Sequence, residues 1–153
     1  MTADGETVFV PIVDMADTHD ARVYDKARNG AGIHAVDAGT GEVRWNARAD
    51  NVCGERQFCD PGISAAATSI PGVVFAGHLD GRFRAYDSKS GKVIWSFNTT
   101  EPVETISGAK ASGGSMSGPG AAVAEGHVVI NSGYGLYFHM PGNVLLVFAP
   151  APE

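Results

Sequence analysis

The stretch AVDAGTGEVRW at Ala35–Trp45 returns with the same spacing as AYDSKSGKVIW at Ala85–Trp95. In each copy, side chains that alternate in polarity lead up to an aspartate, which predicts a strand with one buried face. The aspartate and the glycine that follows predict a tight turn, because the short carboxylate accepts backbone N–H bonds and glycine adopts a positive φ. A second strand ends on tryptophan. Each copy is therefore predicted to be a β-hairpin with a large aromatic anchor.

Each hairpin contains residues with predicted structural roles. They are Asp37, Gly41 and Trp45 in the first copy and Asp87, Gly91 and Trp95 in the second. On the second strand, simple alternation predicts that the valine two positions before each tryptophan shares its buried side. Val43 and Val93 are these valines, and Phe97 is expected on the same side in the second copy.

More predicted strands surround the hairpins. ETVFVPIV at 6–13 and GVVFAG at 72–77 each precede one hairpin, and the small-residue segment 62–72 precedes the second of these strands. A third unit has strands in GPGAAVAEG, HVVINSG and GNVLLVFA, within residues 118–149. We expect three strands in the first unit, four in the second and three in the third.

A repeat of about fifty residues, built as a four-stranded antiparallel meander, is typical of a β-propeller blade. The expected fold is all-β, a partial β-propeller forming a single domain over residues 1–153. Blade repeats are expected at about 6–49, 62–99 and 117–150. A closed ring needs at least four blades, so we expect the chain to be part of a larger propeller. The alternative is a β-sandwich with a chance repeat, which explains neither the shared register nor the tryptophans.

Turns alternate between the two ends of a meander, so each connection can be assigned to one end or the other. The Asp-Gly turns fall at one end, and the long connections 14–31, 50–61, 98–116 and 133–142 fall at the other, which we call the long-loop face. Function is expected on this face, because ligand sites concentrate in loops held by a rigid scaffold.

Composition and charge exclude some functions. Glycine (20) and proline (8) are frequent, and no apolar stripe has helical spacing, which favours β structure. The formal charge of −6 disfavours nucleic acid as a partner. The apolar runs are too short to span a bilayer and no signal peptide follows Met1, so we expect a cytosolic chain or one lacking its N-terminus.

Two cysteines, Cys53 and Cys59, lie in the polar loop CGERQFC. In an oxidising compartment they would close a small disulfide loop, and in a reducing one they would be two thiols.

The hairpin motif resembles the blade motif of dehydrogenases that depend on pyrroloquinoline quinone (PQQ), in which the tryptophan packs between blades. The segment from Cys53 to Gly120, followed by NSGYG at 131–135 and PGNVLLVFAP at 141–150, is similar to the C-terminal part of polyvinyl-alcohol dehydrogenases. The resemblance covers nearly the whole chain. It implies a periplasmic quinoprotein with an eight-bladed propeller that oxidises secondary alcohols.

The resemblance also implies cofactors and partners. PQQ would lie over the propeller axis with a Ca²⁺ ion, and a cytochrome c would accept the electrons. The family's metal ligands and catalytic aspartate come from blades that this sequence lacks, so the missing N-terminal blades are expected partners and the chain alone is expected to be inactive. A propeller of the same repeat type that only binds or scaffolds another protein is the alternative, because a fold does not fix a function.

The glycine-rich loops SGGSMSGPG (112–120) and NSGYG (131–135) are the most informative segments for a ligand site. Backbone without side chains lets a flat cofactor approach, and neighbouring polar groups can orient it. The expected cofactor contacts are Ser115, Asn131 and Tyr134, with Ser132 beside them. The alternative is that these glycines only relieve crowding near the axis.

Two weaker signals remain. The first long loop has carboxylates that either bind Ca²⁺ or form a solvated acidic loop, and we favour the loop because the EF-hand glycine and terminal glutamate are absent. These residues are Asp14, Asp17, Asp20 and Asp25, with His19 beside them. His78 and His139 lie on the long-loop face, where a surface position is more common than a place in a ligand wall.

Overall fold

The computed structural model describes residues 1–14, 21–135 and 138–151. Its first sheet contains β1 (Thr2–Asp4), β2 (Thr7–Ile12), β3 (Gly32–Asp37) and β4 (Val43–Arg48). Its second sheet contains β5 (Thr68–Ile70), β6 (Val73–Gly77), β7 (Arg82–Asp87) and β8 (Val93–Asn98). Its third sheet contains β11 (Ala122–Ala124), β12 (His127–Ser132) and β13 (Val144–Phe148). A ribbon of β9 (Val103–Glu104) and β10 (Lys110–Ala111) and the short 3-10 helix η1 (Ala21–Val23) are also present.

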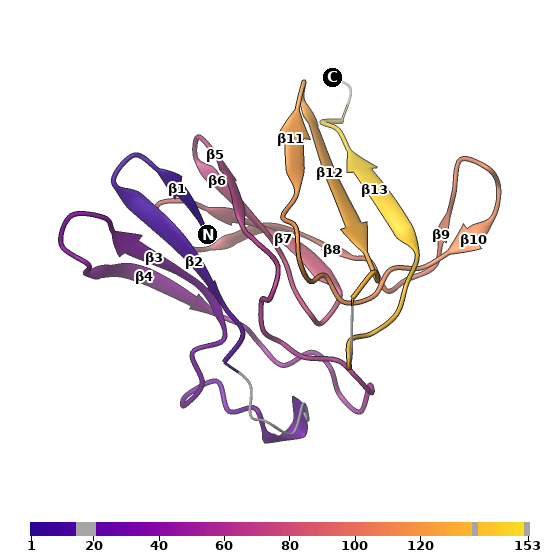
Figure 1. The fold of residues 1–153 in the computed structure, drawn as a ribbon, viewed down its shortest axis with the longest axis horizontal. Coiled ribbons are helices and arrows are strands. Elements are labelled where there is room, and N and C mark those ends of the chain that lie inside the picture. The colour runs from indigo at the N-terminus through magenta and orange to yellow at the C-terminus, as the bar shows by residue number, and fades with distance from the viewer. Residues whose placement is uncertain (15–20, 136–137, 152–153) are drawn as a thin grey trace.

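The three sheets follow one another along an arc, each an antiparallel meander in chain order (Figure 1). The fold is all-β and forms a partial β-propeller, as the repeat predicts. The first sheet has four strands where three were expected, because Thr2–Asp4 pairs with Thr7–Phe9. The turn between them contains Gly5 with φ 58°, a conformation that glycine adopts without strain. No helix in the described ranges is long and apolar enough to cross a membrane.

The hairpin turn is organised by its aspartate. The Oδ1 atom of Asp37 accepts hydrogen bonds from the backbone N–H groups of Gly39 and Thr40, each at 2.9 Å. Arg44 donates a further hydrogen bond to the same carboxylate, and together these donors hold the pKa of Asp37 well below its usual range. Asp87 accepts from the backbone N–H of its own turn in the same way, at 2.7 Å.

Each tryptophan contacts the next sheet. Trp45 packs against Phe9 with ring centroids 5.8 Å apart, and its Nε1 donates to the carbonyl oxygen of Ser88 in the second sheet's turn at 3.0 Å. Trp95 meets Phe148 of the third sheet edge-on, with centroids 5.0 Å apart. The repeated tryptophans therefore join neighbouring blades.

The prediction for Val43 and Val93 is wrong, because they are 57% and 52% exposed. Trp45 lies opposite Ala35, but Val43 lies opposite Val36, so Arg44 is an extra residue in a β-bulge. A bulge changes the alternation, which puts the valine and the tryptophan on opposite faces. The second hairpin has the same register shift.

Strand β7 was predicted to have one buried face, but both of its faces are buried. Phe83 and Ala85 face the third sheet, whose Ile130 shares a cluster with Phe83. Tyr86 faces the other way and packs in a cluster with Ile33 of the first sheet. Strand β7 is covered on both sides because the second sheet lies between two neighbours.

The third sheet has one covered face and one open face. Leu145 and Val147 are 68% and 58% exposed, whereas Val144 on the same strand, β13, is buried. Apolar residues therefore remain exposed on the face that points away from the second sheet. An exposed row of this kind marks a surface suited to contact with another element.

Candidate functional site on the long-loop face

Three of the four long connections gather at one end of the sheets, whereas 98–116 forms the β9–β10 ribbon, which extends to the side (Figure 1). Figure 1 shows 50–61 and the described parts of 14–31 and 133–142 at the lower end, away from the turns at Gly5 and Gly126. Three features meet at this end: a disulfide loop, a crossing of glycine-rich segments and a buried polar cluster.

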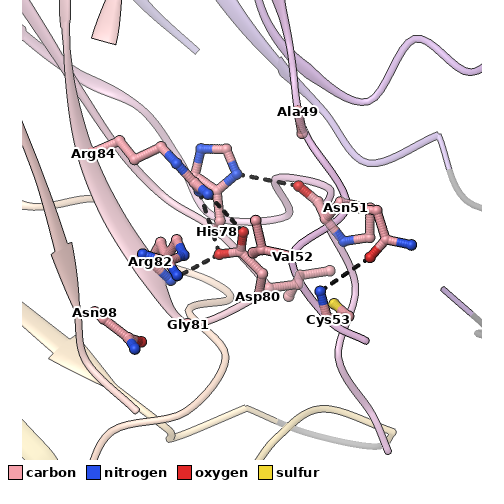
Figure 2. Close-up of polar contacts among 12 residues, drawn as sticks. Ala49, Asn51, Val52, Cys53, His78, Asp80, Gly81, Arg82, Arg84 and Asn98 are labelled. Atoms are coloured by element: carbon pink, nitrogen blue, oxygen red, sulfur yellow. Dashed lines mark hydrogen bonds and ion pairs between the residues drawn. The ribbon is translucent and has the colours of Figure 1, made fainter. Parts of the chain in front are cut away.

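The predicted disulfide is formed between Cys53 and Cys59, whose Cα atoms are 5.5 Å apart. Both cysteines are buried although the loop is polar, and they share an apolar cluster with Met140. The backbone N–H of Cys53 is held by the side chain of Asn51 at 3.0 Å (Figure 2). The loop is therefore packed against the third sheet's long connection, 133–142.

The glycine-rich segments pack backbone against backbone. A Cβ atom on Gly114 would lie 2.2 Å from the carbonyl oxygen of Met140, and one on Gly133 would lie 2.1 Å from the Cα of Gly142. A side chain at either position would require the neighbouring backbone to move. At these positions the glycines allow three chain segments to cross.

The serine hydroxyls stabilise this crossing. Ser115 is fully buried; its Oγ donates to the carbonyl oxygen of Leu79 at 2.6 Å and accepts from the backbone N–H of Met140 at 3.0 Å. Ser132 is also buried and bonds to Thr99 at 2.7 Å and to the Gly114 carbonyl at 2.8 Å. Both hydroxyls are engaged inside the protein.

Asn131 and Tyr134 are the more accessible of the expected cofactor contacts. Asn131 lies opposite Leu145 in the third sheet and is therefore on its open face. Tyr134 follows β12 and is 59% exposed. Their contact with a cofactor stays a prediction.

Sequence reasoning missed a buried polar cluster between the first two sheets. Asp80 is fully buried and forms a two-point ion pair with Arg84, with N–O distances of 2.7 and 3.3 Å. Asp80 also accepts from the backbone N–H of Arg82 at 2.8 Å, and Figure 2 shows its carboxylate between these two donors. A buried ion pair of this kind holds a turn in one arrangement, since an unpaired charge would be costly there.

His78 belongs to the same cluster, so the expectation of a surface position is wrong. Its Nδ1 lies 3.2 Å from the carbonyl oxygen of Pro61, and its Nε2 lies 2.7 Å from the hydroxyl of Tyr86. A carbonyl only accepts, so Nδ1 carries the proton and Nε2 accepts from Tyr86. Burial, and then the charge of Arg84, lowers the pKa of His78 to about 4, so the ring is neutral at pH 7. A neutral ring with both nitrogens occupied is a structural residue.

The acidic loop is only partly visible. Asp17, His19 and Asp20 lie outside the described residues. The side chain of Asp14 accepts from the backbone N–H of Gly30, and Asp25 accepts from that of Ala27 at 2.9 Å. Within the described ranges, no three His, Cys, Asp or Glu side chains are grouped so that they could bind a metal ion.

Comparison with known proteins fits this architecture. The family model PQQ_2, described as outer membrane protein assembly factor BamB, matches residues 4–130. The chain belongs to the PQQ-repeat propeller family. Its repeat of hairpin, turn and tryptophan is the blade repeat of that family.

Individual relatives are dehydrogenases. The polyvinylalcohol dehydrogenase of Pseudomonas sp is 40% identical over 161 residues, which cover 97% of this chain and 24% of that protein. The enzyme of the same name from Sphingopyxis sp. strain 113P3 is 42% identical over 136 residues, 86% of this chain and 20% of that protein. The crystal structure of quinohemoprotein alcohol dehydrogenase from Comamonas testosteroni aligns with 64% of this chain and 14% of its own, at 29% identity and a TM-score of 0.48. The PQQ-repeat chain thus spans at most about a quarter of the length of these curated relatives.

Proposed function

We propose that this chain is one arc of the propeller of a PQQ-dependent alcohol dehydrogenase that oxidises secondary alcohols of the polyvinyl-alcohol type. The observation that carries the proposal is the 40% identity to a polyvinylalcohol dehydrogenase over 97% of the chain. Identity over this length includes the loops of the long-loop face, where binding residues of propellers are expected to lie.

The open face of the third sheet supports the proposed arc. Leu145 and Val147 on the third sheet are exposed apolar side chains on a terminal blade. A neighbouring blade of an eight-bladed ring would cover them, as strand β7 of the second sheet is covered on both sides here. The relatives, about four times longer than the part matched here, have enough chain for further blades.

The accessible polar groups can contribute hydrogen bonds to PQQ. The quinone and carboxylate oxygens of PQQ accept hydrogen bonds, and the hydroxyl of Tyr134 can donate one. The amide of Asn131 can also donate, but it lies on the sheet face that a neighbouring blade would cover, so Tyr134 is the stronger candidate. When bound, PQQ supplies the acceptor for the two electrons of the alcohol. In this proposal Ser115 holds the loop behind these contacts and does not touch the cofactor.

Calcium, the electron acceptor and the location belong to the same proposal. Ca²⁺ takes six to eight oxygen ligands, so the proposal places its ligands outside the described residues, where other blades would supply them. A cytochrome c in the periplasm would receive the electrons. The disulfide supports this location, because disulfides persist in oxidising compartments.

The proposal is tested by dye-linked alcohol oxidation with added PQQ and Ca²⁺. The assay compares the 153-residue chain with the longest product of its reading frame, on 2-butanol, polyvinyl alcohol and the primary alcohol 1-butanol. We expect the longer product to oxidise the secondary alcohols faster than 1-butanol, and the short chain to be inactive. Failure of the longer product to oxidise any of them would refute the proposal and favour a binding module. Turnover by a monomeric short chain would refute the proposed arc.

A further inference from the structure

Two exposed aromatic rings from different blades meet on the long-loop face. Phe58 lies in the disulfide loop and is 44% exposed, and Phe138 lies in the loop after β12 and is 62% exposed. Their ring centroids are 6.2 Å apart and the ring planes are inclined by 43°. These two side chains form one apolar surface, which we call the aromatic pair.

The aromatic pair has a rigid support. Phe58 precedes Cys59, and the disulfide is buried against Met140, two residues after Phe138. Met140 is in turn held by Ser115, which bonds to both its backbone N–H and its carbonyl oxygen at 3.0 and 2.9 Å. The rings are therefore displayed on a cross-linked base, so little conformational freedom is lost when a ligand binds.

Both phenylalanines have an unusual backbone conformation. Phe58 and Phe138 have φ angles of 61° and 50°, a region that bulky side chains rarely adopt. Two such residues, side by side and exposed, indicate a surface kept for contact with a ligand.

We propose that the aromatic pair binds the chain of an extended hydroxylated hydrocarbon polymer, away from the carbinol that reacts. This rests on the proposed function. Only one carbinol of such a polymer reacts at a time, so the neighbouring units must lie across the surface around the site. Methylene groups pack on aromatic faces, and an uncharged pair of rings suits an uncharged polymer. Tyr134, a proposed cofactor contact, lies in the same long connection as Phe138.

The test is affinity electrophoresis in native gels that contain polyvinyl alcohol, with dextran gels as the polymer control. The variants are Phe58→Asn, Phe138→Asn and the double variant, because asparagine tolerates a positive φ and removes the ring without straining the loop. The matched control is Ile106→Asn, a fully exposed apolar side chain between β9 and β10. We expect the wild-type chain and the control to be retarded by polyvinyl alcohol and not by dextran. The apparent Kd of the double variant should be about tenfold weaker.

Equal retardation of the wild type and the double variant, or no retardation of the wild type, would overturn the proposal. So would size-exclusion chromatography in which the double variant loses only self-association, because the pair would then be a contact between copies. The readout needs no cofactor and so is independent of turnover. Polymer binding without oxidation would contradict the proposed function alone, and oxidation with an unchanged KM for the polymer in the double variant would contradict the aromatic pair alone.

Discussion

The two hairpin turns offer a matched pair of substitutions that isolates packing between blades. Gly41 and Gly91 occupy equivalent positions, with φ angles of 75° and 70°. A Cβ atom on Gly41 would have no atom within 4 Å, whereas one on Gly91 would lie 2.5 Å from Cε3 of Trp45. Gly41→Ala therefore introduces backbone strain alone, and Gly91→Ala introduces the same strain together with a clash against the neighbouring blade.

The two substitutions are expected to lower the free energy of unfolding by different amounts. An alanine in the left-handed region costs about 1–2 kcal/mol, and overpacking adds about 1–3 kcal/mol. Displacing the Trp45 ring would break its packing on Phe9 and its hydrogen bond to the Ser88 carbonyl, so the ring does not relieve the clash without a loss of stability. We expect Gly41→Ala to lower the free energy of unfolding by about 1–2 kcal/mol and Gly91→Ala by about 2–5 kcal/mol.

Urea denaturation followed by circular dichroism measures both losses. A double-mutant cycle with Trp45→Ala assigns the difference, because the cost of Gly91→Ala should fall to that of Gly41→Ala once the ring is removed. Equal losses for the two single variants would refute the packing of Trp45 on the next blade. An undiminished loss for Gly91→Ala in the Trp45→Ala background would refute it as well.

Two further predictions concern the long-loop face. The pKa of His78 lies at about 4 in the folded chain, below its usual 6.5, so the unfolded state binds the proton more readily and stability should fall by about 2 kcal/mol from pH 7 to pH 5. Urea midpoints at the two pH values test this, and an equal drop in His78→Gln would contradict it. Replacing Cys53 and Cys59 by serine should cost about 2 kcal/mol, because the unfolded chain loses a short closed loop. Mass spectrometry before and after reduction should show that the wild type gains the mass of two hydrogen atoms. Free thiols in protein from an oxidising compartment would contradict the bond.

The repeat was predictable from the sequence because its residues act locally. Asp37 bonds to backbone N–H groups within its own turn, and Gly41 takes a backbone conformation that its own turn requires. Pairing of the two cysteines likewise depends on a short loop. The bulge at Arg44 was not predictable, because an extra residue in one strand shows only against the register of its partner.

The site was less predictable, because whether a polar side chain is available to a ligand depends on segments far apart in the sequence. The loop around Ser115 has the composition of a ligand loop, yet its hydroxyl is engaged by Leu79 and Met140. In the sequence, Asp80 and Arg84 look like ordinary exposed charges in a turn and a strand, but in the fold they form a buried ion pair. In a propeller each blade face is covered by the next blade, so the same polar residue is a surface group in a terminal blade and a structural group in an inner one. Accessibility in the present arc therefore separates Tyr134 and the aromatic pair, which are exposed, from Ser115 and His78, which are buried and bonded within the protein.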